Sequence, residues 1–129
     1  MSFVDILAAR APQRLDLGEN GYLIVSAHGG RIYGPFLDGA EAFDWVADAP
    51  PGDWNIGGER VWIAPERYLN FSDPGRMIET YRVDPGMDPG HWRIADADGA
   101  ALRLKMQTKL ELLGGLGAVE LDITRDIDI

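Results

Sequence analysis

A short segment in the middle of the chain gathers side chains that could bind a sugar. Arg60, Glu66 and Arg67 lie around one expected strand and the turn that follows it. Arginine and carboxylate groups donate and accept paired hydrogen bonds, which sugar hydroxyls require. Trp62 and Tyr68 could offer a flat face to a pyranose ring. The alternative is structural: the three charged residues form a salt bridge and both rings lie in the core. The spacing alone favours this alternative.

The two histidines are further candidates for acid–base or sugar-binding chemistry. His91 follows a Pro-Gly pair and precedes Trp92, and His28 precedes two glycines. Histidine is the commonest side chain for proton transfer near neutral pH. A half-exposed histidine at the start of a strand is the more ordinary interpretation of both. We include His91 among the candidate sugar-binding residues, with Arg60 and its neighbours.

Other motifs in the sequence predict turns. Asp96 and Asp98 before Gly99 superficially resemble a calcium loop, but the later ligands and the glutamate at the twelfth position are missing. The glycine cluster at 114–117 has no following lysine, as a phosphate loop would. The chain has no cysteine, which excludes disulfides, thiolate zinc sites and a cysteine nucleophile. We therefore expect no metal and no cofactor.

Composition limits the remaining classes. The 129 residues form one expected domain, 46% hydrophobic and 26% charged, as in ordinary globular proteins. Twelve basic against twenty-one acidic residues give a net charge of −9, which argues against a nucleic-acid partner. No apolar run approaches the roughly 18 residues of a membrane span. The first residues contain no basic region typical of a secretory signal, so we expect a cytoplasmic protein without a membrane partner.

Hydrophobic periodicity predicts an all-β fold with one short N-terminal helix. Ser2 can cap a helix that ends near Arg10, before Pro12. Apolar and β-branched runs then predict strands at residues 22–26, 31–38, 43–46, 60–64, 77–83 and 91–95. Pro35 places the second of these strands at a sheet edge or a bulge. Three Asp-Pro-Gly steps, at 73–75, 84–86 and 88–90, predict turns. The expected architecture is an antiparallel β-sandwich.

The last third of the chain predicts an antiparallel hairpin. Apolar and polar residues alternate over 102–112 and again over 119–129. A loop at 114–117 would set one register, with four expected cross-strand pairs: Lys109 with Asp122, Gln107 with Thr124, Lys105 with Asp126, and Arg103 with Asp128. Every charged pair in this register has opposite signs, which favours it. Arg125 interrupts the apolar face, so we expect an acidic neighbour or water beside it.

One segment resembles a known family. Residues 55–71, with Gly57-Gly58 followed by Arg60, Trp62 and Pro65, are similar to a sugar-side loop of the galactose-mutarotase-like superfamily. Residues 29–34 resemble a strand with a glycine bend in such proteins, and residues 43–46 resemble the strand after it. The resemblance runs over roughly residues 20–129. It implies that the chain is the N-terminal part of a larger β-supersandwich.

The resemblance also implies a function. Many members of that superfamily are aldose 1-epimerases, which use a histidine and a glutamate from later strands. This chain stops before those strands, so neither catalytic residue can be assigned to a position here. We therefore expect a carbohydrate-binding protein, without epimerase activity in this chain alone. Its expected sugar-binding residues are Arg60, Trp62, Glu66, Arg67 and His91.

The strand expected at residues 119–129 suggests a second interpretation. Alternation continues to the last residue, Ile129, which is typical of a strand that is cut or paired elsewhere. The chain could instead be a structural β domain without enzymatic activity, which oligomerises through exposed strand edges. In that case we expect Ile123, Ile127 and Ile129 to be buried by a second copy.

Overall fold

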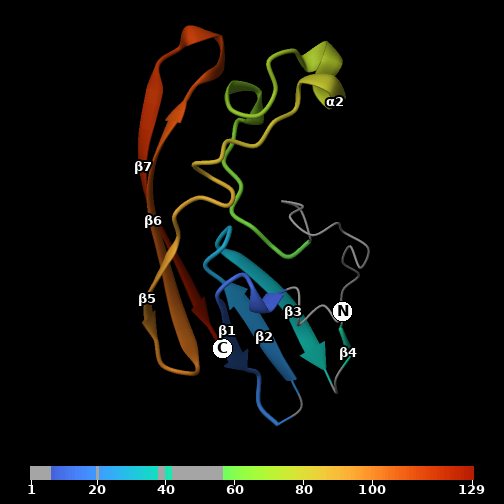
Figure 1. Cartoon of the computed structure of the whole chain (residues 1–129), viewed down its shortest axis with the longest axis vertical. Coiled ribbons are helices and arrows are strands. Elements are labelled where there is room, and N and C mark those ends of the chain that lie inside the picture. The colour runs from blue at the N-terminus through green and yellow to red at the C-terminus, as the bar shows by residue number, and fades with distance from the viewer. Residues whose placement is uncertain (1–6, 20, 38–39, 42–56) are drawn as a thin grey trace.

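Most of the regular secondary structure of the computed structural model lies in two antiparallel β-sheets (Figure 1). The structure describes residues 7–19, 21–37, 40–41 and 57–129. In the described part, each strand pairs with its neighbour in the chain. The first sheet contains β1 (Pro12–Asp16), β2 (Gly21–Ser26), β3 (Arg31–Leu37) and β4 (Ala40–Glu41). The second sheet contains β5 (Arg93–Ala97), β6 (Ala101–Glu111) and β7 (Ala118–Asp128). The expectation of an all-β fold is confirmed.

The two sheets share one apolar core. Side chains from both sheets form a buried cluster: Leu15, Val25, Trp92, Leu102, Leu104, Met106 and Ile127. A second cluster covers the other face of the first sheet and contains Leu7, Ile24, Tyr33 and Phe36. Neighbouring residues of β2 thus enter different clusters, because successive side chains of a strand point to opposite faces. The packing of one sheet against the other agrees with the expected sandwich.

The first sheet confirms two sequence predictions near its ends. Leu7 and Ala8 are helical, and the Arg10 N–H donates to the Leu7 carbonyl over 2.8 Å, where the helix was expected to end. Residues 1–6 of that predicted helix lie outside the described residues, as does the strand predicted at 43–46. Pro35 lies at a shift in the β2–β3 register between Tyr22 and Ile24, so the predicted bulge is present. Proline fits there because it has no N–H for the ladder.

The segment between the sheets differs from the prediction. Residues 77–83 were expected to form a strand, but η2 (Pro74–Arg76) leads into a single helical turn, α2 (Met77–Thr80). The Asp73 carboxylate accepts the Gly75 N–H over 2.8 Å, and Pro74 occupies the first helical position. A capping aspartate followed by proline favours a helical start, which overrode the apolar pattern. The predicted strand at 77–83 is therefore wrong.

Residues 60–64 do not form the predicted strand either. Glu59 alone pairs with the sheet, exchanging hydrogen bonds of 2.7 and 2.9 Å with Ile32 of β3. The chain then leaves the sheet, and the Arg60 side chain forms an ion pair with Asp88. A short helical turn, η1 (Glu66–Tyr68), follows. Across the described ranges, no helix is long and apolar enough to cross a membrane.

The predicted C-terminal hairpin is confirmed, but its register is wrong by two residues. The structure pairs Lys109 with Glu120, Gln107 with Asp122, Lys105 with Thr124, and Arg103 with Asp126. The connection runs from Leu112, whose N–H donates to the Gly117 carbonyl over 2.8 Å, through η3 (Leu113–Gly115). This loop starts two residues earlier than expected. Opposite charges face one another in three pairs of the expected register and in two pairs of the observed one, so the charge pattern favoured the wrong register.

The turn predicted at residues 96–99 is present but shorter. β5 runs from Arg93 to Ala97 rather than over 91–95, so Asp96 lies in the strand and only Asp98 and Gly99 belong to the turn. The Asp98 carboxylate accepts the N–H groups of Ala100 and Ala101, over 3.0 and 2.8 Å. These hydrogen bonds lower the pKa of Asp98. Asp98 therefore closes a hairpin turn.

Arg125 crosses from the second sheet to the first. Its Nη1 donates to the Gly30 carbonyl over 2.7 Å, and its guanidinium forms an ion pair with Glu59. The expected acidic neighbour of Arg125 is therefore present. Ile127 is buried within its own chain, and Ile123 packs against the same core, whereas Ile129 is 50% exposed. A second copy is not needed to bury Ile127.

Candidate functional site

A recess lies between residues 60–63 and residues 83–88, beside the loop end of β6. Its volume is about 30 Å³, and it is open to solvent. Its apolar lining comes from Val61, Ile63, Leu69, Val83, Met87 and Leu110. Its other lining residues are Trp62 and the polar Arg60, Asn70, Asp84 and Asp88. An apolar hollow with a few polar groups is the usual form of a small-molecule site.

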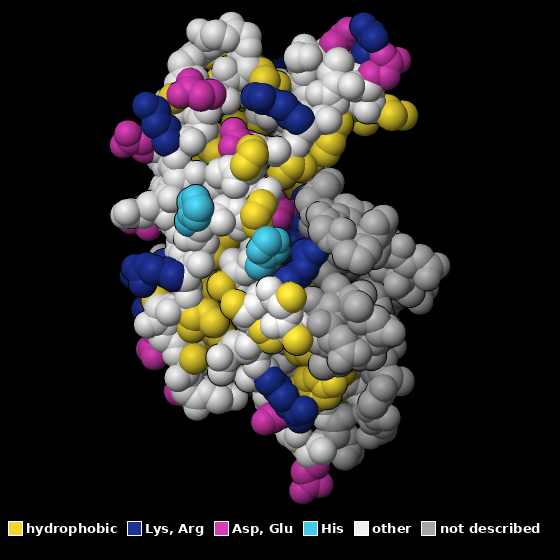
Figure 2. Space-filling view, in the orientation of Figure 1, with side chains coloured by type: hydrophobic (Ala, Val, Ile, Leu, Met, Phe, Trp, Pro, Cys, Tyr) yellow, Lys and Arg dark blue, Asp and Glu magenta, His cyan; other side chains and the backbone are white. Residues whose placement is uncertain are grey.

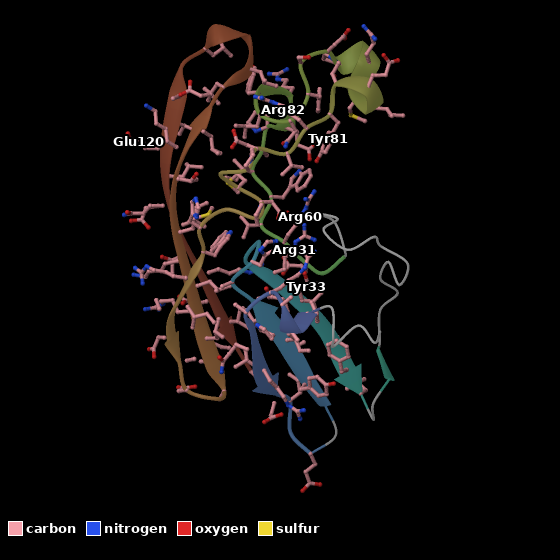
Figure 3. All side chains as sticks on the ribbon, viewed as in Figure 1. Arg31, Tyr33, Arg60, Tyr81, Arg82 and Glu120 are labelled. Atoms are coloured by element: carbon pink, nitrogen blue, oxygen red, sulfur yellow. The ribbon has the colours of Figure 1, made fainter. Side chains whose placement is uncertain are left out.

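A buried carboxylate fixes one side of this recess. Asp88, 7% exposed, accepts hydrogen bonds from Arg31 Nη2 over 2.6 Å and from Arg60 Nη1 over 3.1 Å. The Arg31 side chain is fully buried, and its Nη1 donates to the Gly57 carbonyl over 2.6 Å. These contacts join β3, the segment after Glu59, and the turn before β5. Arg60 is therefore held in place at the mouth of the recess (Figure 3).

An aromatic pair lies next to Arg60. The Arg60 guanidinium carbon is 4.0 Å from the centroid of the Trp62 ring, and the Trp62 residue is 44% exposed. The Tyr81 ring is nearly parallel to Trp62, with centroids 6.3 Å apart. Burial raises the pKa of Tyr81, a shift that Arg60 opposes and Glu66 reinforces. The charges of Arg60 and Glu66 thus both influence the Tyr81 hydroxyl. Because its pKa is raised, this hydroxyl is a neutral hydrogen-bond donor at neutral pH.

The structure brings together three of the five predicted site residues. Arg60 and Trp62 are in contact, and both Arg60 and Glu66 act on Tyr81. Arg67 instead stacks on its own neighbour Tyr68, with the guanidinium carbon 4.6 Å from the ring centroid. It also donates to the Tyr68 hydroxyl over 2.8 Å. Arg67 is exposed, so it lies at the surface beside the cluster rather than in it.

His91 lies apart from the other candidate residues, and the alternative with both aromatic rings in the core is not observed. His91 is exposed in the turn before β5, and within the described segments no hydrogen bond or ion pair links it to Arg60 or Glu66. The alternative placed the aromatic rings of Trp62 and Tyr68 in the core. This is wrong, because Trp62 is exposed and Tyr68 is only half-buried. The carboxylate that pairs with Arg60 is Asp88, not Glu66.

Sequence reasoning missed Tyr81 and Asp88. Asp88 belongs to the third of three Asp-Pro-Gly steps, all interpreted as turns. The Asp73 and Asp84 carboxylates accept N–H groups of their own loops, each over 2.8 Å. Asp88 instead pairs with arginines 57 and 28 residues away in sequence. No local signal distinguishes this third step, because its partners are distant in the chain.

His28 lies at the edge of the arginine cluster. Partial burial lowers its pKa, the positive charge of Arg10 lowers it further, and Asp88 opposes the shift. The imidazole is therefore mostly neutral at neutral pH. Within the described ranges, no group of three or more histidine, aspartate or glutamate side chains could hold a metal ion. The recess offers polar groups for hydrogen bonding and one exposed aromatic ring.

Comparisons of the chain with protein-family models, with curated proteins and with solved structures gave no match. The interpretation of the recess rests on the residues that line it.

Proposed function

We propose that this chain is a carbohydrate-binding protein that resembles the N-terminal half of a galactose-mutarotase-like protein. One observation carries the proposal: Trp62 is 44% exposed at the mouth of the recess, with Arg60 against its ring. An exposed tryptophan costs apolar hydration unless something covers it. A pyranose can stack its C–H face on such a ring and present its hydroxyls to the polar groups around it.

The polar groups near Trp62 have the types that sugar hydroxyls need. Arg60 donates, and Asn70 and Asp84 lie in the lining of the same recess. Glu66 is not among the lining residues, but burial raises the pKa of Tyr81, whose ring is nearly parallel to Trp62, and the charge of Glu66 adds to this rise. The recess itself, with a volume of about 30 Å³, has room for only about one water molecule, so the sugar would lie on the exposed ring at its mouth. We do not assign epimerase activity to this chain alone. That reaction needs an acid and a base on either side of the anomeric centre, and His91 is exposed in the turn before β5, outside the lining of the recess.

We expect galactose or glucose to shift the indole N–H resonance of Trp62 at millimolar concentration. Trp62→Ala removes the stacking surface and should weaken binding at least about tenfold, since one ring contact is worth roughly 1 kcal/mol or more beyond its buried area. NMR titration of both proteins measures this. Arg67→Ala is the control, because Arg67 stacks on Tyr68 away from the recess. Equal losses in the two variants, or shifts confined to distant loops, would contradict the proposal.

A second candidate function follows from the strand edges. β7 offers eleven residues of open edge, and Ile129 beside it is 50% exposed. Open edges of this length recruit further strands. The chain would then be a structural β domain that assembles through open strand edges, although the four acidic residues of β7 oppose pairing of residues 119–129 with their own copy. Sedimentation equilibrium tests this candidate. A single species of 14.2 kDa at every micromolar concentration would exclude it.

A further inference from the structure

The outer edge of β7 is a long open binding edge. β7 is the last strand of the order β5-β6-β7, and in the described residues no strand pairs with its outer side. It is eleven residues long and regular, without the bulge or proline that commonly protects an edge. Its backbone is therefore ready to pair with one more strand.

The hydrogen bonds of the hairpin show which backbone groups face outward. The Leu112 N–H donates to the Gly117 carbonyl, and the Ile129 N–H donates to the Ala100 carbonyl. In an antiparallel ladder, hydrogen-bonded residues alternate with residues whose N–H and carbonyl groups point away. Odd-numbered residues of β7 therefore bond to β6. The outward groups belong to Glu120, Asp122, Thr124, Asp126 and Asp128.

The same five residues give this edge its charge. Four are acidic, and their side chains share the solvent face of the sheet, where Glu120 projects from the outer side of β7 (Figure 3). Magenta acidic side chains mark the surface on the same side of the molecule (Figure 2). On the same face of the sheet, β6 places basic and polar residues next to these acidic side chains. Arg103 pairs with Asp126 over 2.5 Å, and Gln107 donates to Asp122 over 3.2 Å.

The charges oppose pairing of β7 with a second β7. A two-fold antiparallel contact keeps the acidic face of both strands on one side. Centred on Thr124, it would place Glu120 opposite Asp128 and Asp122 opposite Asp126. Like charges that lie directly opposite one another destabilise strand pairing. Other in-face registers place the same acidic residues opposite one another or opposite Thr124, so the edge disfavours its own copy.

The inner, apolar face of β7 indicates which side chains an added strand would need on that face. Val119, Leu121 and Ile123 are only partly buried. An added strand with apolar side chains on this face would extend the core. We propose that the outer edge of β7 binds an extended peptide in antiparallel pairing, with basic residues on its solvent face and apolar residues on its inner face. This inference does not depend on sugar binding.

A peptide with the sequence of β6, residues 101–111, is a suitable probe. It carries Arg103, Lys105 and Lys109 on one face and apolar residues on the other. The control peptide replaces these three residues by glutamate. We expect the control to bind at least about tenfold more weakly, because the attractive charge pairs on the solvent face become repulsive. Binding of the probe should also weaken as salt is added.

Amide hydrogen exchange identifies the bound edge. In the free protein, the N–H groups of Asp122, Thr124 and Asp126 should exchange fast, while those of Leu121 and Ile123 are protected by β6. Saturating probe peptide should slow exchange at the first three. Binding that leaves them fast would overturn the proposal. Protection of the same amides that rises with protein concentration alone would also overturn it, since the occupant would then be a second copy.

Thr124→Pro blocks the edge from the protein side. Proline removes only an N–H that points outward, so pairing with β6 can persist. We expect the variant to lose probe binding at least about tenfold. Thr124→Val keeps the N–H and should bind as the original chain does. If Thr124→Pro fails to fold, the comparison of basic and acidic peptides on the original protein still decides the question.

Discussion

Replacing Asp88 by asparagine should lower the free energy of unfolding by about 3–5 kcal/mol. The Asp88 carboxylate is 7% exposed and accepts a 2.6 Å hydrogen bond from Arg31, whose side chain is fully buried. Asparagine keeps the size of the side chain but removes its negative charge. The buried guanidinium of Arg31 would then lose the negative charge of Asp88. A domain of this size is commonly stable by roughly 5–15 kcal/mol, so the loss is a large fraction.

The chain contains a matched control for this change. Asp73 begins the same tripeptide, Asp-Pro-Gly, but is exposed and accepts only the Gly75 N–H of its own turn. Asparagine can accept that hydrogen bond as well as aspartate. We therefore expect Asp73→Asn to change the free energy of unfolding by no more than about 0.5 kcal/mol. Urea denaturation of the three proteins measures both effects. Similar stabilities for both variants would show that the Arg31–Asp88 pair is not sealed from water.

The Arg31–Asp88 pair also positions a residue of the candidate site. Arg60 also bonds to Asp88 and lies on the Trp62 ring. Removing the carboxylate should therefore loosen Arg60 as well as destabilise the fold. The ring of Trp62 can remain exposed when Arg60 moves, so sugar binding should weaken less in Asp88→Asn than in Trp62→Ala. This order separates residues that would touch a sugar from residues that position them.

The fold was predictable where the pattern was local. Strict alternation over residues 102–112 and 119–129 predicted the hairpin, and the break in the pattern at Arg125 predicted an acidic neighbour, found at Glu59. The register was not predictable, because Lys109 meets an acidic residue in either pairing. Loop geometry decides between them, and several glycines allow several loops. The strand prediction for residues 77–83 was wrong for a related reason. The capping Asp73 favours a helical turn, and this outweighed an apolar pattern only seven residues long.

The candidate site was predictable only in part. Arg60, Trp62 and Glu66 lie within seven residues, so the sequence itself places them close together. Tyr81 and Asp88 come from later turns. Their positions depend on the path of residues 57–92, which connect the two sheets in the sequence. Long-range contacts determine this path, and no local hydrophobic period predicts them. Arg67 and His91 have suitable chemistry, but the same fold keeps them apart from the recess.

Gly30→Ala should be the second most disruptive of the changes considered. Gly30 is buried in the β2–β3 turn with φ +59, in the left-handed region that favours glycine. A Cβ there would lie 2.6 Å from two carbon atoms of the Trp92 ring. Trp92 belongs to the core shared by the two sheets, so its ring has little room to move. The Gly30 carbonyl also accepts the hydrogen bond from Arg125 of β7.

Two costs therefore combine at Gly30. The backbone conformation costs about 1–2 kcal/mol with any side chain, and crowding in a packed core costs about 1–3 kcal/mol more. We expect Gly30→Ala to lower the free energy of unfolding by about 2–5 kcal/mol. Gly114→Ala separates the two costs, because Gly114 has φ +75 and nothing within 4 Å of its added Cβ. It should lose only about 1–2 kcal/mol. Equal losses of unfolding free energy for Gly30→Ala and Gly114→Ala in urea denaturation would contradict this prediction. They would mean that the Trp92 ring moves aside at no energetic cost, and that the two sheets are packed less tightly at this turn than their contacts indicate.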